Sequence, residues 1–159
     1  MTEPAPSQTK TALVSCMRNE GLFLLEWVAY HQGLGFDAII IVTNDCTDGS
    51  DILATRLAEL GHIVHIDHSV LPPNAPQDAG MDLALEWLRG HEFTWVLHID
   101  SDEFLLIEHK DGQIQDLLAE LPKADVVPIA WRTFGDSGVS DWMPGQSVLK
   151  AFTHAEPKI

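Results

Sequence analysis

"VLHIDSDEFLLI", residues 96–107, is the stretch of sequence that decides the fold. A run of apolar side chains leads into Asp100, Ser101, Asp102 and Glu103. Continuous apolar runs of this kind are typical of parallel strands that are buried on both faces. Carboxylates this close together repel one another and are costly to desolvate, so they need either solvent or a cation. The stretch therefore predicts a buried strand that ends in one of these two environments.

The rest of the chain alternates between short apolar runs and stretches with helical spacing. Strands are expected over residues 11–16, 37–43, 62–68, 93–100 and 124–131, and helices over 21–35, 48–61, 78–91 and 112–122. The apolar stripes are expected to be Leu24, Trp27, Val28 and Leu34 on the first helix, and Ile52, Leu53, Leu57 and Leu60 on the second. This alternation predicts an α/β fold, with a mostly parallel sheet covered by helices on both faces.

The length of 159 residues fits one domain. Residues 1–10 are polar and contain prolines, so we expect a flexible tail followed by a single domain over 11–159. The N-terminus lacks the apolar segment of a signal peptide, and no apolar run is long enough to cross a bilayer. The two cysteines, Cys16 and Cys46, fit reduced thiols better than a disulfide framework. We expect a cytoplasmic protein of bacterial type.

The charge of the chain limits its partners. The formal net charge is -15, which disfavours nucleic acids and anionic membranes because both require a basic surface. A phosphate-bearing small molecule remains compatible if a bound metal ion supplies positive charge locally.

Three polar clusters directly follow predicted strands: "MRNEG" at 17–21, "TNDCTDGS" at 43–50 and "DSDEF" at 100–104. Ligands of parallel sheets bind outside the carboxyl ends of the strands, so these clusters are expected to converge on one edge. Neither G-x-G-x-x-G nor G-x-x-x-x-G-K-[ST] occurs in the sequence. The clusters therefore predict a ligand site that is neither a dinucleotide fingerprint nor a P-loop.

Asp100 and Asp102 are two residues apart, so in an extended segment they point the same way. They could share a hard cation with oxygen ligands, either Mn²⁺ or Mg²⁺, or they could form a solvated acidic turn. A haloacid-dehalogenase-type phosphatase also ends a strand in D-x-D. There the motif follows the first strand and precedes Thr or Val, whereas here it comes late and precedes Glu103. That reaction is therefore the less favoured alternative.

Four motifs occur in order along the chain. They are Arg18-Asn19-Glu20, Glu26-Trp27 with Tyr30-His31, Asn44-Asp45-Cys46-Thr47-Asp48-Gly49, and Asp100-Ser101-Asp102. Together they resemble the nucleotide-sugar-binding half of GT-A glycosyltransferases, and they are most similar to family 2-like and family 92-like enzymes. The resemblance covers residues 13–104, with a weaker echo in "WRTFGDSG" at 131–138.

The resemblance implies transfer of a sugar from a nucleotide-diphospho-sugar to an acceptor hydroxyl, with Mn²⁺ or Mg²⁺ on the diphosphate. The implied nucleotide-sugar-binding residues are Met17, Arg18, Asn19, Glu20, Asn44, Gln77, Asp78, Asp100 and Ser101, and the implied metal ligands are Asp100 and Asp102. Many relatives have Asp where Asn44 stands, so the base of the donor stays open. No general base is assigned; Asp136 and Asp141 are only candidates.

Several of these residues have simpler interpretations. Asp48 could be the N-cap of its helix, and Glu26, Trp27 and His31 could pack and form hydrogen bonds within the core. The stretch after Asp102 is short for an acceptor-binding half, so this half is expected to be short or missing and the chain an incomplete or minimal form. A non-catalytic nucleotide-sugar-binding or interaction module is therefore the alternative function.

Overall fold

The computed structural model describes residues 9–69, 73, 75–121, 123–143 and 145–157. The chain divides into two compact units, Met1–Glu120 and Leu121–Ile159, which are described separately below. Most of the predicted tail over 1–10 lies outside the described residues, and a single domain over 11–159 stays a prediction. No helix in the described part of the chain is long and apolar enough to span a membrane.

The first unit contains a parallel sheet with the strand order β3-β2-β1-β4. The strands are β1 (Thr11–Met17), β2 (Ala38–Asn44), β3 (Val64–His68) and β4 (Trp95–His98). The predicted parallel sheet is therefore confirmed. The last of these strands is shorter than the expected 93–100, because the chain turns away from the sheet soon after His98.

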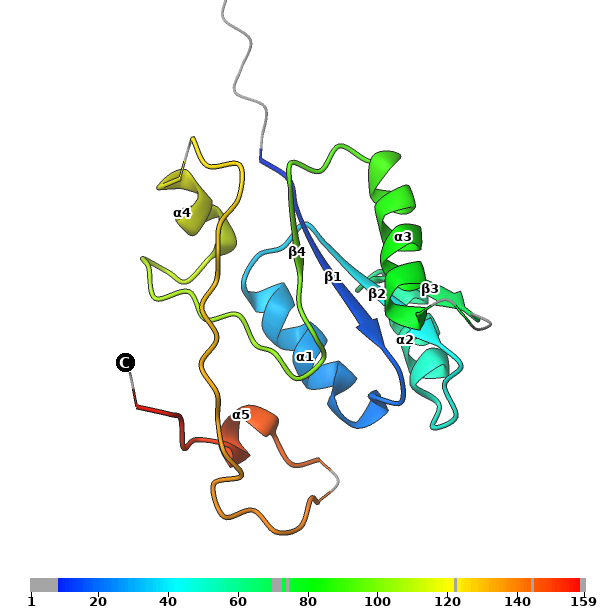
Figure 1. The fold of residues 1–159 in the computed structure, drawn as a ribbon, viewed down its shortest axis with the longest axis vertical. Helices are drawn as coiled ribbons and strands as arrows, with labels where there is room; N and C mark the ends of the chain where they lie inside the picture. The colour runs from blue at the N-terminus through cyan, green and yellow to red at the C-terminus, as the bar shows by residue number, and fades with distance from the viewer. Residues whose placement is uncertain (1–8, 70–72, 74, 122, 144, 158–159) are drawn as a thin grey trace, which may run out of the picture. The chain divides into compact units, whose positions relative to one another are not determined.

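Helices cover both faces of the sheet, as predicted. They are α1 (Gly21–Gly33), α2 (Ser50–Glu59), α3 (Pro76–Arg89) and the short α4 (Ile114–Ala119). Helix α1 lies along one side of β1 and α3 along the other (Figure 1). Helix α2 packs on the same face as α1, because its buried residues belong to the same apolar cluster.

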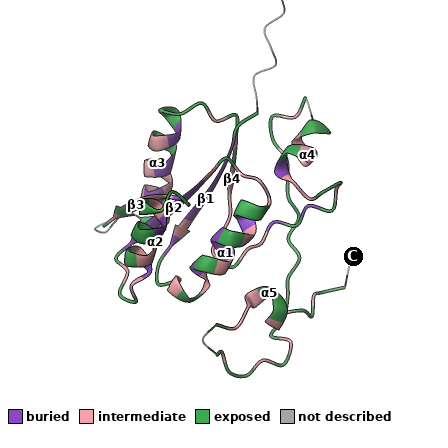
Figure 2. Cartoon of the chain, turned by 180° about the vertical axis from the view of Figure 1, so that it is seen from behind, coloured by how far each residue is buried: buried purple, intermediate pink, exposed green. Residues whose placement is uncertain are grey.

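The core consists of two apolar layers on either side of β1 and β2. On one face Leu13 and Ile41 pack with Trp27 of α1. On the other face Val14 packs with Ala84 of α3. Alternate residues of each strand thus meet different helices, which explains why the strands read as continuous apolar runs. Figure 2 shows the buried residues concentrated in the central strands and on the inward sides of the helices.

Gly80 allows α3 to approach the sheet closely. A Cβ atom at this position would lie 3.1 Å from Cys16 Sγ, 3.1 Å from Val42 Cγ1 and 3.2 Å from His68 Nε2. These are tight contacts from three neighbouring strands, so a larger residue would push the helix outward. The close approach brings the first turn of α3, with Gln77, next to the strand ends.

The apolar stripe predicted for the second helix is partly wrong. Leu57 is buried, but Ile52 is 72% exposed and Leu60 is 55% exposed, and the small Ala54 is buried in their place. The helix is rotated so that Ala54 faces the sheet at close range. Sequence periodicity favours large apolar residues for the inward face, and it therefore missed an alanine contact.

The second unit contains the short helix α5 (Val148–Ala151) and an antiparallel bridge between Phe134 and Ala155. The strand expected over 124–131 is wrong, because no strand forms among the described residues 123–143. Val126 and Trp131 are 81% and 85% exposed. An apolar run becomes a strand only if another strand accepts its hydrogen bonds, and sequence pattern does not supply that partner.

Candidate functional site

The three polar clusters that follow β1, β2 and β4 meet at one edge of the sheet. Asn19 Oδ1 accepts a hydrogen bond from the backbone N–H of Thr47, 2.8 Å away. The backbone N–H of Gly21 donates to Asp48 Oδ2 at 3.2 Å, and the Ser101 hydroxyl hydrogen-bonds the carboxylate of Glu20. The first loop therefore contacts both of the others, as the parallel topology predicted.

Glu20 ends the loop after β1 and lies near the carboxylates of Asp102 and Asp48 from the other two polar clusters. Burial raises the pKa of the half-buried Glu20 carboxyl above its usual value, and the charges of Asp102 and Asp48 raise it further. The hydrogen bond from Ser101 opposes this shift only in part. The edge therefore holds an excess of negative charge contributed by the ends of three strands.

The D-x-D turn, residues 100–103, closes on itself through Glu103. The backbone N–H of Asp100 donates to Glu103 Oε2 at 2.9 Å, and the backbone N–H of Glu103 donates to the Asp100 carbonyl at 3.2 Å. Glu103 thus uses its carboxylate to hold the turn. The carboxylates of Asp100 and Asp102 belong to exposed residues, which leaves them available to a ligand.

The start of α3 reaches the same turn. Gln77 Nε2 donates to Asp100 Oδ1 at 3.4 Å, while Asp78 is exposed in the first helical turn. The thiol of Cys16 lies 3.8 Å from the Gln77 carbonyl. Burial, followed by the charge of Asp100, raises the pKa of Cys16 to about 11. This cysteine is therefore a protonated thiol at neutral pH and not a nucleophile.

The end of β2 contributes Asn44, which is buried, and Asp45, which is exposed. The Ser69 hydroxyl donates to Asp45 Oδ1 at 2.7 Å, and this hydrogen bond is the main cause that lowers the pKa of Asp45. The charge of the exposed Arg18 lowers it further. Arg18 is therefore a basic residue close enough to Asp45 to act on its charge, and His68 is another.

Two residues at this edge, neither of them glycine, have a left-handed backbone. They are Asn19, with φ 60°, and Asp45, with φ 44°. Asn and Asp tolerate this region better than most residues, but it still costs free energy, and such strain is found most often at functional sites. Hydrogen bonds to Thr47 and Ser69 hold the two side chains in place.

Asp48 has a structural role that differs slightly from the predicted one. Helix α2 begins at Ser50 with Gly49 as its N-cap, so Asp48 is not the N-cap itself. Its Oδ1 nevertheless accepts from the backbone N–H of Ser50 at 2.9 Å, and its Oδ2 accepts from Gly21 at the start of α1. One carboxylate therefore links the first residues of two helices.

Trp27 and His31 are buried and form hydrogen bonds, which confirms the interpretation of the E-W-x-x-Y-H helix as a packing element. Their partners, however, lie in the segment that follows the D-x-D turn. The motif spacing alone could not identify these partners.

The residues that could hold a metal ion are few. Among the described residues, no group of three or more His, Cys, Asp or Glu side chains is arranged to hold one. Asp100 and Asp102 could supply two carboxylate ligands, and these are donors that Mn²⁺ and Mg²⁺ prefer. The remaining ligands would come from phosphate oxygens and water.

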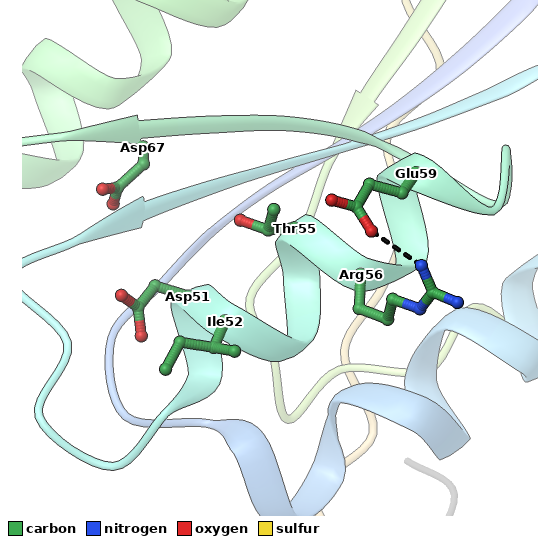
Figure 3. Close-up of a pocket in the computed structure, with 6 residues that line it drawn as sticks. All are labelled: Asp51, Ile52, Thr55, Arg56, Glu59 and Asp67. Atoms are coloured by element: carbon green, nitrogen blue, oxygen red, sulfur yellow. Dashed lines mark hydrogen bonds and ion pairs between the residues drawn. The ribbon is translucent and has the colours of Figure 1, made fainter.

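A separate pocket of about 290 Å³ lies beside α2 and β3 (Figure 3). Its lining comprises Asp51, Ile52, Thr55, Arg56, Glu59 and Asp67. Arg56 is paired with Glu59 at 2.8 Å, so its charge is largely satisfied within the helix. None of the predicted site residues lines this pocket, and it is distinct from the strand-end site.

Comparison with known proteins gives distant relatives of one kind, although no family model matches the chain. A glycosyltransferase family 92 protein of Ricinus communis is 27% identical over 162 residues, covering 96% of this chain and 28% of the relative. Another from Oryza sativa subsp. japonica is 28% identical over 165 residues, covering 95% of this chain and 27% of the relative. The chain thus spans less than a third of the length of the relatives it matches.

The fold has a counterpart among solved structures. The crystal structure of S. aureus TarS matches 72% of this chain and 20% of its own chain, with a TM-score of 0.51 and 16% sequence identity. This similarity concerns the fold alone. Of the two families that the motifs resemble, these relatives represent family 92 rather than family 2. The chain is a distant homologue of the glycosyltransferase family 92 proteins and has a GT-A-type fold.

Proposed function

We propose that the strand-end site binds a nucleotide-diphospho-sugar together with Mn²⁺ or Mg²⁺, as the donor site of a glycosyltransferase. The observation that carries this proposal is the gathering of Glu20, Asp48 and Asp102 at the ends of three parallel strands, where burial first, and then the charges of Asp102 and Asp48, raise the pKa of Glu20. A divalent cation bound by Asp100 and Asp102 would relieve this excess of negative charge.

Each part of the site has a distinct task in this proposal. Asp100 and Asp102 would hold the metal ion, which when bound would neutralise charge on the leaving diphosphate. Gln77 orients the Asp100 carboxylate through its hydrogen bond. In this proposal Arg18, Asn19, Glu20, Asn44 and Ser101 flank the nucleoside, with Asp78 at the entrance of α3. Met17, which was expected there too, is buried in the apolar layer with Trp27, so it supports the end of β1 from beneath.

The transfer itself requires an acceptor hydroxyl that attacks the anomeric carbon of the sugar while the nucleoside diphosphate leaves. No residue is assigned as the general base, and Asp136 and Asp141 belong to the second compact unit. A non-catalytic nucleotide-sugar-binding module would use the same donor site without transfer. Turnover of a bound donor with a hydroxyl acceptor separates these two functions.

A screen of donors tests the proposal. UDP-, GDP-, CMP- and dTDP-sugars are added to the protein with and without Mn²⁺, and the melting temperature is recorded. A ligand that binds only the folded state raises this temperature by linkage. We expect one nucleotide to give a selective, Mn²⁺-dependent rise. If no nucleotide gives such a rise, the site does not bind a donor in the way proposed.

Asp102→Asn is expected to fold normally but to bind Mn²⁺ with UDP or GDP at least about tenfold more weakly, because a neutral amide is a poorer ligand for a hard cation. Isothermal titration calorimetry measures both affinities. Asp111→Asn, which changes an exposed carboxylate before α4, is the matched control and should bind like the wild type. Unchanged affinity in Asp102→Asn would identify the D-x-D segment as a solvated acidic turn.

A further inference from the structure

We propose that Trp27, Tyr30 and His31 of α1 form a clamp on the backbone of residues 103–105 and thereby position the D-x-D turn. The clamp rests on the proposed function in one respect, since its effect on metal affinity presupposes that the turn binds metal. The three side chains act as positioning residues. They contact the chain that follows the turn, and not the ligand.

The clamp replaces strand pairing where the chain leaves the sheet. Strand β4 ends at His98, and Ile99 makes one more backbone hydrogen bond to the carbonyl of Val14 at 3.2 Å. Beyond the turn, backbone groups pair with side chains of α1 instead. Trp27 Nε1 donates to the Glu103 carbonyl at 2.9 Å, and the Tyr30 hydroxyl donates to the Leu105 carbonyl at 2.9 Å.

His31 completes the clamp in a defined tautomer. The backbone N–H of Leu105 donates to His31 Nε2 at 3.3 Å, so this nitrogen carries no proton. His31 Nδ1 lies 2.9 Å from the Trp27 carbonyl, which can only accept, so Nδ1 carries the proton. Burial lowers the pKa of His31 to about 4, which keeps Nε2 available as an acceptor at neutral pH.

Ring contacts fix the residue between the two clamped positions. Phe104 stacks on His31 with ring centroids 5.8 Å apart and an interplanar angle of 16°. It also meets Tyr30 edge-on, with centroids 5.2 Å apart. Residues 103, 104 and 105 are therefore each held by a side chain of α1, either through the backbone or through the ring.

This anchoring reaches the carboxylates through Glu103. The carbonyl of Glu103 is held by Trp27, while its side chain and its N–H both bond the backbone of Asp100. Asp102 is the covalent neighbour of this anchored residue. A turn held in its binding geometry before the ligand arrives loses less freedom on binding, so the clamp should raise the affinity for metal.

The test separates the clamp from ordinary core packing by removing hydrogen bonds while keeping volume. Tyr30→Phe deletes one donor and His31→Leu deletes the acceptor for Leu105. His31→Gln offers an amide oxygen near the position of Nε2 and is the rescue variant. Val28→Ala is the control, because Val28 is buried on the same helix and its side chain has no hydrogen-bonding atom.

Two readouts are taken for each variant: amide hydrogen exchange at Leu105, and Mn²⁺ affinity in the presence of UDP or GDP. We expect faster exchange at Leu105 and about two- to tenfold weaker Mn²⁺ binding in Tyr30→Phe and His31→Leu, in line with the loss of one partly buried and one buried hydrogen bond, respectively. Relative to His31→Leu, His31→Gln should restore much of the exchange protection at Leu105 and much of the Mn²⁺ affinity. Val28→Ala should lower the denaturation midpoint without changing the Mn²⁺ affinity. If the affinity of every variant simply follows its stability, the clamp is only core packing.

A failure of the proposed function gives a different pattern. If the wild type binds no Mn²⁺ with either nucleotide, the proposed donor site is wrong. The clamp is then tested by amide exchange at Leu105 and by which ring nitrogen of His31 carries the proton. Unchanged Leu105 exchange in Tyr30→Phe, which keeps the ring and is the variant safest to fold, would then overturn it. So would long-range ¹⁵N–¹H spectra of the wild type that place the His31 proton on Nε2.

Discussion

Replacing Trp27 with alanine is expected to lower the free energy of unfolding by about 3–5 kcal/mol, as other large-to-small changes of buried aromatic residues do. Trp27 is fully buried in the apolar layer between α1 and the sheet. The substitution leaves a cavity there. It also leaves the Glu103 carbonyl without its Nε1–H donor, which adds a polar group with no partner.

Chemical denaturation measures this effect. Leu22→Ala is the matched control on the same helix, because Leu22 is 69% exposed and its loss should change the free energy by no more than about 0.5 kcal/mol. Trp27→Phe keeps most of the ring and should fall between the two. A Trp27→Ala protein with the wild-type midpoint but lost nucleotide binding would contradict this account and make Trp27 part of the ligand site.

Because of His31, the free energy of unfolding is expected to fall by about 3 kcal/mol as the pH falls from 6.5 to 4. This magnitude follows because each pKa unit of difference between the folded and unfolded chains corresponds to about 1.4 kcal/mol. Burial is the main cause that lowers the pKa of His31 from 6.5 to about 4. Between these two pH values the unfolded chain takes up a proton that the folded chain does not. The free energy of unfolding therefore decreases as the pH is lowered from 6.5 to 4. Above pH 6.5 and below pH 4, His31 does not change it further.

Denaturation midpoints at several pH values, compared with those of His31→Gln, isolate this contribution. The comparison is needed because burial also lowers the pKa of His65, which acts in the same direction. The pKa of Glu20 is raised in the folded protein, so its contribution to stability is lost as the pH rises, whereas that of His31 is gained. Parallel pH profiles for the wild type and His31→Gln would show that His31 titrates normally in the folded protein.

Much of the fold could be predicted because one physical pattern dominates it. Strands buried on both faces must be continuously apolar, so β1 and β2 were predicted nearly to their ends. Parallel topology then required the three polar clusters to converge, and Glu20 does contact Ser101 across the sheet edge.

The errors arose where structure depends on a partner that sequence does not reveal. Residues 124–131 have the composition of a strand but no pairing strand among the described residues of their unit. Helix α2 buries Ala54 instead of Ile52, because the spacing to the sheet suits a small residue. The clamp joins Trp27 to Glu103, which lie 76 residues apart, so helical spacing gave no indication of it.

The paired carboxylates of Asp100 and Asp102 fit one of two physical situations. If they merely end a strand in water, their repulsion is screened and a cation changes little. If they form a metal site, a divalent ion stabilises the folded state by RT ln(1+[M]/Kd), which is about 2.7 kcal/mol at a hundredfold excess over Kd. The two situations therefore differ in how stability responds to added metal.

The most direct measurement is the melting temperature of the wild type and of the Asp100→Asn, Asp102→Asn double variant, each with and without millimolar Mn²⁺. The account predicts that Mn²⁺ raises the melting temperature of the wild type and leaves that of the double variant unchanged. Equal rises in both proteins would mean that Mn²⁺ binds elsewhere on this acidic chain, and the assignment of Asp100 and Asp102 as metal ligands would be wrong.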